Sequence, residues 1–470
     1  MKVCLLNDSF PPVIDGVANV VLNYADSLQK DHGASVIVGT PAYPDAEYIG
    51  YDYPVVTYPS LNLGNRVGGY RAGIPFSNES FSALSGFMPD LIHTHCPASS
   101  TILARLLREK CGAPVILTYH TKYEVEIARA VKMKAAAAEG VRAMIGNIEA
   151  CDDVWVVSKG AGESLRALGY EGEYIVMPNG VDYARGRVPA EKVREVTEGY
   201  DLPQDIPIFL FVGRIMTYKG LPLILDALKI VSDGGQDFRM VFIGKGADQP
   251  AMEEKAAALG LSEKCIFVGP VYDRDALRAW NTRADLFLFP STYDTNGLVV
   301  REAAACGLAS VLIRNSCAAE GITDGRNGFV IDENAEAMAA LLLKLSADLP
   351  KLREVGQRAM DEIYLSWPDA VSAAYERYEF VLSERQRRIY AVRRRDVTDY
   401  FFTAAATGMT ERIRLKAFGD RWFNSFRETA EGMMDNVRET TGEIRHSLRE
   451  GAADLKKSAG EFRDNLRRKK

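Results

Sequence analysis

The chain of 470 residues is 47% hydrophobic and 26% charged, a balance typical of a globular protein too long for one hydrophobic core. Its net charge of −6 gives no general reason to expect nucleic-acid binding. The sequence shows no signal-peptide pattern and no apolar run long enough to span a bilayer, so any membrane contact is expected to be peripheral.

The seven cysteines stand singly along the chain, with an odd total and no paired spacing. This pattern argues against a disulfide framework or a zinc site and favours reduced, mostly buried thiols. We therefore expect a cytoplasmic protein.

Short apolar runs alternate with helical patterns from the N-terminus to about residue 380. This alternation is typical of parallel sheets flanked by helices. One series of candidate strands comprises 3–6, 35–39, 91–93, 115–118, 154–157 and 174–177, and a second comprises 208–212, 240–243, 265–268, 286–289, 310–313 and 328–331.

Two such series predict an α/β protein with two doubly wound domains, residues 1–185 and 186–365, whose ligands lie in a cleft at the carboxyl ends of the strands. The segment 178–182 and the polar residues after it are interpreted as the connection between the domains. An aromatic-rich helical stretch over 366–383 is expected to pack back on the first domain.

In the first domain, the loop 7–16 leads from a strand into a helix, where Gly16 would allow a ligand to approach the backbone closely. His93 and His95 follow one later strand, and His120 follows the next. Histidines at strand ends are often only hydrogen-bonded structural residues, and this alternative stays open for His93 and His95.

The second domain begins with a buried strand that ends in Gly213-Arg214, and Lys219 follows five residues later, just before a new helix. Cations at this spacing can hold a diphosphate, the arginine through its planar fork and the lysine as a point charge. For the Gly-Arg pair alone, a surface loop that happens to be basic would be the favoured interpretation.

The most informative segment is 290–307. It places Asp294 in a polar turn after a strand and Glu302 inside a helix that begins near Gly297. A helix that begins this way leaves backbone N–H groups free for a phosphate or a sugar oxygen. The plainer alternative is that Asp294 only caps the helix and Glu302 is a solvated helix residue.

Residues 384–470 differ in character from the rest of the chain. Arginines cluster over 385–395, and from Leu415 onward an apolar stripe repeats with a period of 11 residues, close to three helical turns. Three interpretations compete: a coiled coil or intramolecular partner helix, an amphipathic helix that folds on an anionic membrane surface, and a solvated, largely disordered tail.

The motifs of the second domain, taken together, resemble those of the retaining glycosyltransferases of family 4. They are Gly213-Arg214 with Lys219-Gly220, Asp294-x7-Glu302, and Glu302-Ala-x-Ala-Cys-Gly307. The resemblance extends over roughly residues 1–380 and includes 178–182 and 324–328. It implies the GT-B fold, in which two Rossmann-like domains face a cleft.

The resemblance also implies roles for individual residues. Arg214 and Lys219 would bind the diphosphate of a nucleotide sugar, and Glu302 would bind the ribose hydroxyls. Asp294 would contact the donor sugar, helped by backbone N–H groups around Asn296, Gly297 and Leu298. The family usually has a glutamate at the position of Asp294, which is one methylene longer.

The first domain would hold the acceptor. The resemblance places a contact with the donor sugar or the acceptor at His120, and the form Tyr-His-Thr-x-Tyr around it is most similar to members that glycosylate membrane lipids such as diacylglycerol. The family often has two glycines at the start of the first helix; here Gly16 is kept and Asp15 replaces the other.

Such transferases commonly need no metal or other cofactor, because cations and a helix N-terminus neutralise the leaving diphosphate. Asp273-Arg-Asp275 matches the Asp-x-Asp pattern of metal-dependent transferases, but its place at the start of a helix favours capping. Gly244-Lys-Gly246 is too short to indicate a dinucleotide site.

We therefore expect a hexosyltransferase, peripherally associated with the membrane, that moves a hexose from UDP-glucose to a lipid acceptor and whose residues 384–470 contact anionic lipid. Two alternatives remain at this point. One is a transferase for a soluble or polysaccharide acceptor, and the other is a non-catalytic interaction module with a decayed site.

Overall fold

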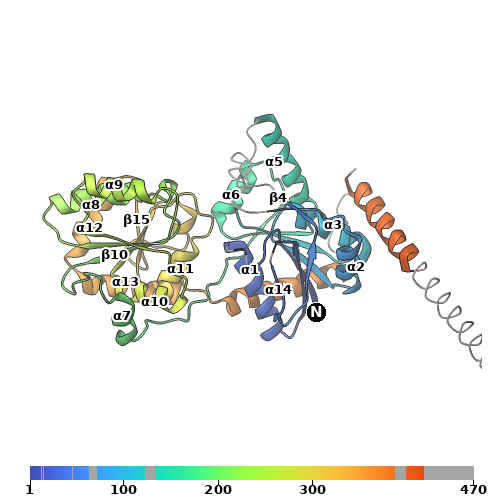
Figure 1. Cartoon of the computed structure of the whole chain (residues 1–470), viewed down its shortest axis with the longest axis horizontal. Coiled ribbons are helices and arrows are strands. Elements are labelled where there is room, and N and C mark those ends of the chain that lie inside the picture. Colours follow the sequence, from blue (N-terminus) through green and yellow to red (C-terminus); the bar gives the residue numbers. More distant parts are fainter. Residues whose placement is uncertain are drawn as a thin grey trace, which may run out of the picture. The chain divides into compact units, whose positions relative to one another are not determined.

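The computed structural model describes residues 1–417 apart from residues 12, 14, 45, 63–70, 122–133 and 387–397. The chain separates into two units, Met1–Ala406 and Thr407–Lys470, and the first contains all the β-sheets of the described residues (Figure 1). None of the helices in the described part of the chain combines the length and apolar character needed to cross a bilayer.

The first domain is built on a parallel sheet of seven strands in the order β3-β2-β1-β6-β7-β8-β9. Its central strands are almost wholly buried, as expected where helices cover both faces. The strands are β1 (Lys2–Leu6), β2 (Ser35–Pro41), β3 (Val55–Tyr58), β6 (Leu91–Thr94), β7 (Val115–Tyr119), β8 (Asp153–Val156) and β9 (Ile175–Val176).

The helices of this domain begin at residues that satisfy their first backbone N–H groups. Ser77 and Ser158 accept such bonds at α2 and α6, and Asp15 does so at α1. The helices are α1 (Gly16–Lys30), α2 (Asn78–Gly86), α3 (Ser99–Cys111), α5 (Lys134–Glu149) and α6 (Lys159–Ala167), and a small antiparallel pair is formed by β4 (Ser60–Asn62) and β5 (Arg71–Gly73).

The second domain has a parallel sheet of six strands in the order β12-β11-β10-β13-β14-β15. Because β10 and β13 are neighbours, the loops that follow them meet at one edge of the sheet. The strands are β10 (Ile208–Val212), β11 (Arg239–Ile243), β12 (Cys265–Gly269), β13 (Leu286–Phe289), β14 (Ser310–Ile313) and β15 (Phe329–Ile331).

Helices surround this second sheet, and one of them lies where the sequence had suggested only a polar connection: α7 (Ala190–Thr197). Its amphipathic pattern is short and none of its residues is buried, which explains why the sequence did not reveal it. The others are η2 (Thr217–Lys219), α8 (Leu221–Asp233), α9 (Gln249–Ala258), α10 (Arg274–Arg283), α11 (Leu298–Ala305), η3 (Cys317–Ala319), α12 (Ala335–Ser346) and α13 (Leu349–Glu362).

Two stretches of chain cross between the domains, and they run side by side. The amide of Val181 donates to the carbonyl of Leu365 at 2.9 Å, and a side chain at Gly180 would lie within 2.6 Å of the Ser366 backbone. After the second crossing, α14 (Trp367–Gln386) lies against α1 of the first domain (Figure 1). Tyr378 of α14 is fully buried in the core of that domain.

The predicted α/β architecture with two parallel sheets is therefore confirmed. The 11-residue repeat and most of the arginine cluster lie outside the described residues, so these predictions remain predictions. The structure does describe a helix over residues 398–417. Its first residues pack on the first domain, although the sequence had placed them in a separate tail.

Candidate active site

The loops after β10 and β13 bring Lys219 and Asp294 together. The Lys219 ammonium donates to both carboxylate oxygens of Asp294, at 2.6 and 2.8 Å. The Ser291 hydroxyl donates to the same carboxylate at 2.5 Å. Lys219 is almost completely buried, and Asp294 neutralises its charge. Asp294 therefore does not act as a helix cap.

A glycine makes this approach of the two loops possible. Gly220 has a φ of +80°, which favours glycine, and a Cβ there would lie 2.6 Å from the carbonyl oxygen of Pro290. Gly244 and Gly246 serve the same purpose at the next loop, where an added Cβ would meet the carbonyls of Gly213 and Ile215 at 1.9 and 2.0 Å. The Gly-Lys-Gly motif is thus explained by packing of the loop.

The N-terminus of α11 carries no side-chain cap. Gly297 occupies the cap position in the left-handed region, with a φ of 57°, and no described side chain accepts from the first N–H groups of the helix. The Asn296 Nδ2 amide is buried and has no hydrogen-bond partner among the described residues. This end of the helix therefore offers unused donors, as expected for residues 296–298.

Glu302 lies on α11 and is paired with an arginine that the sequence did not single out. Arg274 donates to Glu302 at 2.7 Å and also binds Asp182 of the interdomain connection. The guanidinium stacks over the Tyr183 ring, with its central carbon 4.6 Å from the ring centroid. Burial raises the pKa of Glu302 although Arg274 opposes the shift.

Asp273 caps α10, as the sequence predicted, because its side chain accepts from the amides of Asp275 and Ala276 at 2.9 and 3.3 Å. Arg274 between the two carboxylates is the residue that turns toward Glu302. Among the described residues there is no cluster of His, Cys, Asp or Glu side chains able to hold a metal ion.

Arg214 is exposed, and its side chain makes no hydrogen bond or ion pair with any other described residue. Gly16 lies at the start of α1, where an added Cβ would have no atom within 4 Å. Neither residue touches the Lys219–Asp294 pair. Asp15, beside Gly16, has a role that the sequence did not show: it accepts from the amides of Val17 and Ala18 at 2.6 and 3.0 Å.

Three histidines lie in or just after the neighbouring strands β6 and β7 of the first domain and form a buried group. Nε2 of His120 lies 3.0 Å from Nδ1 of His95, and the two rings are stacked. His93 bonds Thr118 at 2.7 Å and Tyr378 of α14 at 2.6 Å. His93 is thus a structural residue that ties α14 to the sheet, in line with the plainer interpretation of its position.

Burial lowers the pKa of His120 to about 3 and holds the pKa values of His93 and His95 well below the usual range. The histidines are therefore neutral at ordinary pH. Neutral imidazole has one donor and one acceptor nitrogen, so one of the two rings donates and the other accepts in the bond between His95 and His120.

His120 also lies beside the segment that contains Asp294. The Thr295 hydroxyl donates to the carbonyl of His120 at 2.5 Å, and the Ser158 hydroxyl donates to the carbonyl of Thr295 at 2.5 Å. The predicted residues His120 and Asp294 are thus brought together from opposite domains. A pocket on this side is lined by Ser158, Asn296 and Gly297, together with Val157, Val176, Pro178, Val300, Arg301, Cys317, Ala318, Glu320 and Ile363.

Comparison with known families and proteins agrees with this geometry. Residues 193–361 match the family of glycosyl transferases group 1, and residues 14–185 match glycosyltransferase family 4. The alpha-monoglucosyldiacylglycerol synthase of Acholeplasma laidlawii is 22% identical over 393 residues, which cover 78% of this chain and 98% of that protein. D-inositol 3-phosphate glycosyltransferase 2 of Catenulispora acidiphila is 30% identical over 310 residues, covering 62% of this chain and 70% of that protein.

Solved structures extend the comparison to the fold. The crystal structure of Anabaena HepE in complex with UDP and glucose superposes with a TM-score of 0.63 at 17% identity, covering 81% of this chain and all of that one. Together with the two parallel sheets, this likeness confirms the predicted GT-B fold.

Proposed function

Because the chain belongs to the family 4 glycosyltransferases, we propose that it moves a hexose from a nucleotide diphosphate sugar, UDP-glucose first, to a membrane lipid such as diacylglycerol. Family membership makes the chain an enzyme, so the non-catalytic alternative is set aside. The identity of the donor, the retaining stereochemistry and the acceptor class are the parts that we propose.

The observation that carries the proposal is the buried Lys219 ammonium, which is paired with Asp294 in the segment just before the uncapped N-terminus of α11. Burying an isolated ammonium is energetically unfavourable. Here the ammonium lies between the Asp294 carboxylate and the aromatic rings of Tyr218 and Phe289. A diphosphate needs a fixed cation and free backbone N–H groups; Lys219 supplies the cation, and the N-terminus of α11 supplies the N–H groups. Arg214, which is exposed and has no partner among the described side chains, would close over the outer phosphate oxygens.

Asp294 would then serve first to hold Lys219 in place, since both of its oxygens are engaged by Lys219 and Ser291. A neutral His120 would hydrogen-bond a sugar or acceptor hydroxyl without adding charge. We propose that the leaving diphosphate itself takes the acceptor's proton on the same face of the sugar, so no protein nucleophile and no metal is required.

The lipid acceptor is supported by the relatives. The relative from Acholeplasma laidlawii, which the chain covers almost completely, is named a monoglucosyldiacylglycerol synthase, and so is one from Streptococcus pneumoniae. Other relatives are named D-inositol 3-phosphate glycosyltransferases, which favours a phosphorylated, soluble acceptor as the second candidate. We place the enzyme at the cytoplasmic face of the membrane, with residues 384–470 on anionic lipid.

The test is to incubate the full chain with labelled UDP-glucose or GDP-mannose and either a total lipid extract or inositol phosphate. We expect label from UDP-glucose in the lipid phase. Lys219→Ala, Arg214→Ala and Glu302→Ala should each abolish transfer, whereas Lys229→Ala, an exposed lysine on α8, should not. Transfer to inositol phosphate alone would replace the lipid acceptor, and near-normal turnover in all three variants would overturn the site.

A further inference from the structure

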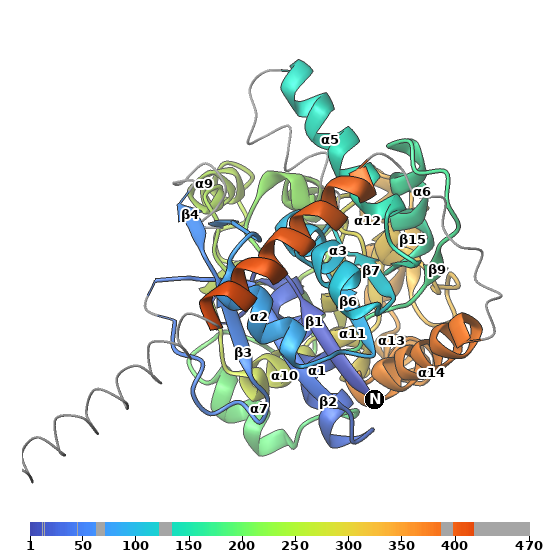
Figure 2. The same ribbon diagram turned by 90° about the vertical axis from the view of Figure 1, so that its right-hand side faces the viewer.

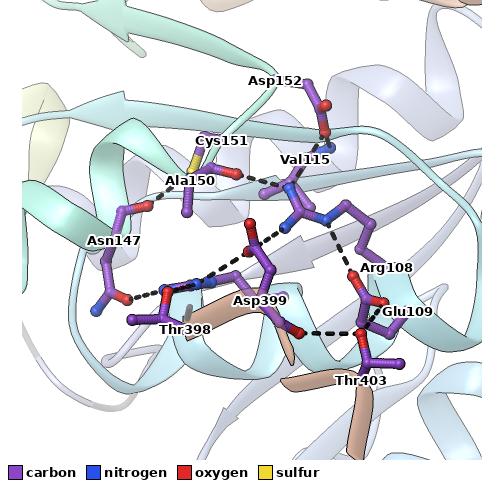
Figure 3. Close-up of polar contacts among 11 residues, drawn as sticks. Arg108, Glu109, Val115, Asn147, Ala150, Cys151, Asp152, Thr398, Asp399 and Thr403 are labelled. Carbon is purple, nitrogen blue, oxygen red and sulfur yellow. Dashed lines mark hydrogen bonds and ion pairs between the residues drawn. The ribbon is translucent and has the colours of Figure 1, made fainter. Parts of the chain in front are cut away.

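Two arginines of α3 form a largely buried, positively charged site on the side of the first domain. The Arg105 and Arg108 side chains are 3% and 12% exposed. Arg105 donates to the side chain of Asn147 on α5 at 3.0 Å, and Arg108 donates to the carbonyl of Ala150 at 2.6 Å (Figure 3). Two guanidinium groups buried so close together call for an anion.

Glu109 and Asp152 lie 3.9 and 3.7 Å from Arg108, and Asp399 adds a carboxylate that reaches both arginines from almost 300 residues further along the chain. Its carboxylate, 3% exposed, lies 3.1 Å from Arg105 and 3.5 Å from Arg108. The hydroxyl of Thr398 accepts from Arg105 at 2.5 Å, and the hydroxyl of Thr403 donates to Glu109 at 2.8 Å (Figure 3). The start of the helix over 398–417 is thereby fixed to α3, as Figure 2 shows.

Packing reinforces these polar contacts on one face of the docked residues. The Phe402 ring lies against the Arg105 guanidinium, with 3.9 Å between the ring centroid and the central carbon, and Ala406 is buried four residues later. We refer to residues 398–406 as the docked arm. The buried side chains and the ion pair of the docked arm hold one of its faces against α3. The opposite face of the docked arm therefore points away from the domain.

That outward face exposes aromatic side chains. Tyr400 and Phe401 are 65% and 59% exposed, and the Phe401 ring meets the edge of Phe76, itself 46% exposed, at 6.4 Å between centroids. Ile74, two residues before Phe76, is also exposed. We call these four side chains the apolar patch.

We propose that the apolar patch is the surface with which the first domain docks on a bilayer that contains anionic lipid, an inference that rests on the lipid acceptor proposed above. Aromatic side chains favour the boundary between lipid headgroups and acyl chains. The docked arm gives them a fixed attachment to the domain expected to take the acceptor.

Charge in the sequence points to the same partner. The chain as a whole carries −6, but residues 384–470 contain 21 basic and 14 acidic residues, and six arginines stand within 385–395, just before the docked arm. Basic residues next to apolar anchors are attracted to anionic lipid headgroups. A second copy of the chain fits less well, because four side chains offer far less than the roughly 800 Å² per partner that a stable interface buries.

A tryptophan reporter tests insertion directly. The full chain with Phe401→Trp is compared with Phe380→Trp, a site on α14 with similar exposure, and with wild type. Each is mixed with phosphatidylcholine vesicles, with or without phosphatidylglycerol, whose acyl chains carry bromine as a quencher. We expect extra quenching for Phe401→Trp alone, and only with the anionic lipid. Equal quenching of the three proteins would overturn the proposal.

A transfer assay separates failure of this inference from failure of the proposed function. The double variant Tyr400→Ser/Phe401→Ser should lose severalfold in transfer to diacylglycerol in vesicles and keep transfer to diacylglycerol in detergent micelles. The matched variant Ile49→Ser/Phe380→Ser should behave as wild type in both. If wild type transfers in neither format, the proposed acceptor is wrong. If the double variant transfers to diacylglycerol in vesicles as fast as wild type, the proposed docking surface is wrong. Self-association of the chain through Phe401 in the absence of lipid would also overturn the docking proposal.

Discussion

Lys219 and Asp294 form a direct ion pair in which the ammonium donates to both carboxylate oxygens. A lysine at this position could otherwise be flexible, but here Asp294, Ser291 and the contact at Gly220 hold its ammonium at one point. In the proposed reaction, such a preorganised charge would need no rearrangement when the diphosphate leaves. The shorter side chain of Asp294, compared with the family's glutamate, suits this holding role.

The buried histidines make the stability of the first domain depend on pH. Each has a pKa lowered by burial, that of His120 to about 3, whereas a histidine of the unfolded chain titrates near about 6.5. Below that pH the unfolded state binds protons that the folded state cannot. The folded state is therefore fully stable above about pH 6.5 and loses stability as the pH falls.

We predict that the free energy of unfolding of the first domain decreases between pH 6.5 and pH 4.5, by up to about 1.4 kcal/mol per pH unit for each histidine. Thermal unfolding followed by circular dichroism at several pH values measures this. His120→Gln should reduce the pH dependence, and His32→Gln, outside the buried group, should not. An equal pH dependence in wild type and His120→Gln would contradict the prediction.

At the scale of elements, the helix N-termini show where an anion can bind. Asp15 caps α1, Asp8 accepts from the first two amides of α3 at 3.1 and 2.8 Å, and Glu320 accepts from the first two amides of α6 at 2.7 and 2.6 Å. These three helices carry their own carboxylates. α11 lacks one, so among these four its N-terminus is the one open to a phosphate.

The docked arm is also an element whose contribution can be measured. Asp399→Ala leaves the buried Arg105 without that carboxylate, and breaking a buried pair in this way typically costs about 3–5 kcal/mol. We expect a lower free energy of unfolding in urea and faster tryptic cleavage after the arginines of 393–395. Asp233→Ala, which removes an exposed pair on α8, should change stability by less than about 1 kcal/mol. Comparable losses in the two variants would refute the anchoring role.

At the scale of the whole molecule, the first domain is completed by segments from the far end of the chain. α14 returns to it through Tyr378 and His93, and the docked arm returns through Asp399 and Arg105. A truncation that ends the chain before the docked arm would therefore remove contacts that stabilise the first domain as well as the tail residues proposed to bind lipid.

We predict that a chain of residues 1–417 unfolds at the same temperature as the full chain, whereas 1–386 unfolds several degrees lower because Arg105 and Arg108 lose the carboxylate of Asp399. Flotation with anionic vesicles should be strongest for the full chain, weaker for 1–417 and lost for 1–386. Thermal unfolding and flotation of the three proteins check both statements. If 1–386 matched 1–417 in both measurements, the arm would have no structural or membrane role.

The local patterns of the sequence predicted much of this protein. Apolar runs of three to five residues predicted the strands of both parallel sheets apart from β3, and they did not reveal the small β4–β5 pair; the burial of these three strands is partial. The capping role of Asp273 could be predicted because it depends on amides two and three residues away. The positions of Lys219, Asp294 and Glu302 could be read because a parallel sheet gathers the loops at its carboxyl edge.

The sequence by itself thus determined the two-sheet fold and indicated the residue types of the proposed diphosphate site. Only the tertiary structure decided which side chains meet: Arg274 with Glu302 across 28 residues, Thr295 with His120 across 175, and Arg105 with Asp399 across 294. Helix and strand periodicities, and caps, depend on neighbours within a few residues. Ion pairs and buried hydrogen bonds between distant segments depend on the order of the strands and the packing of the helices, which no local pattern records.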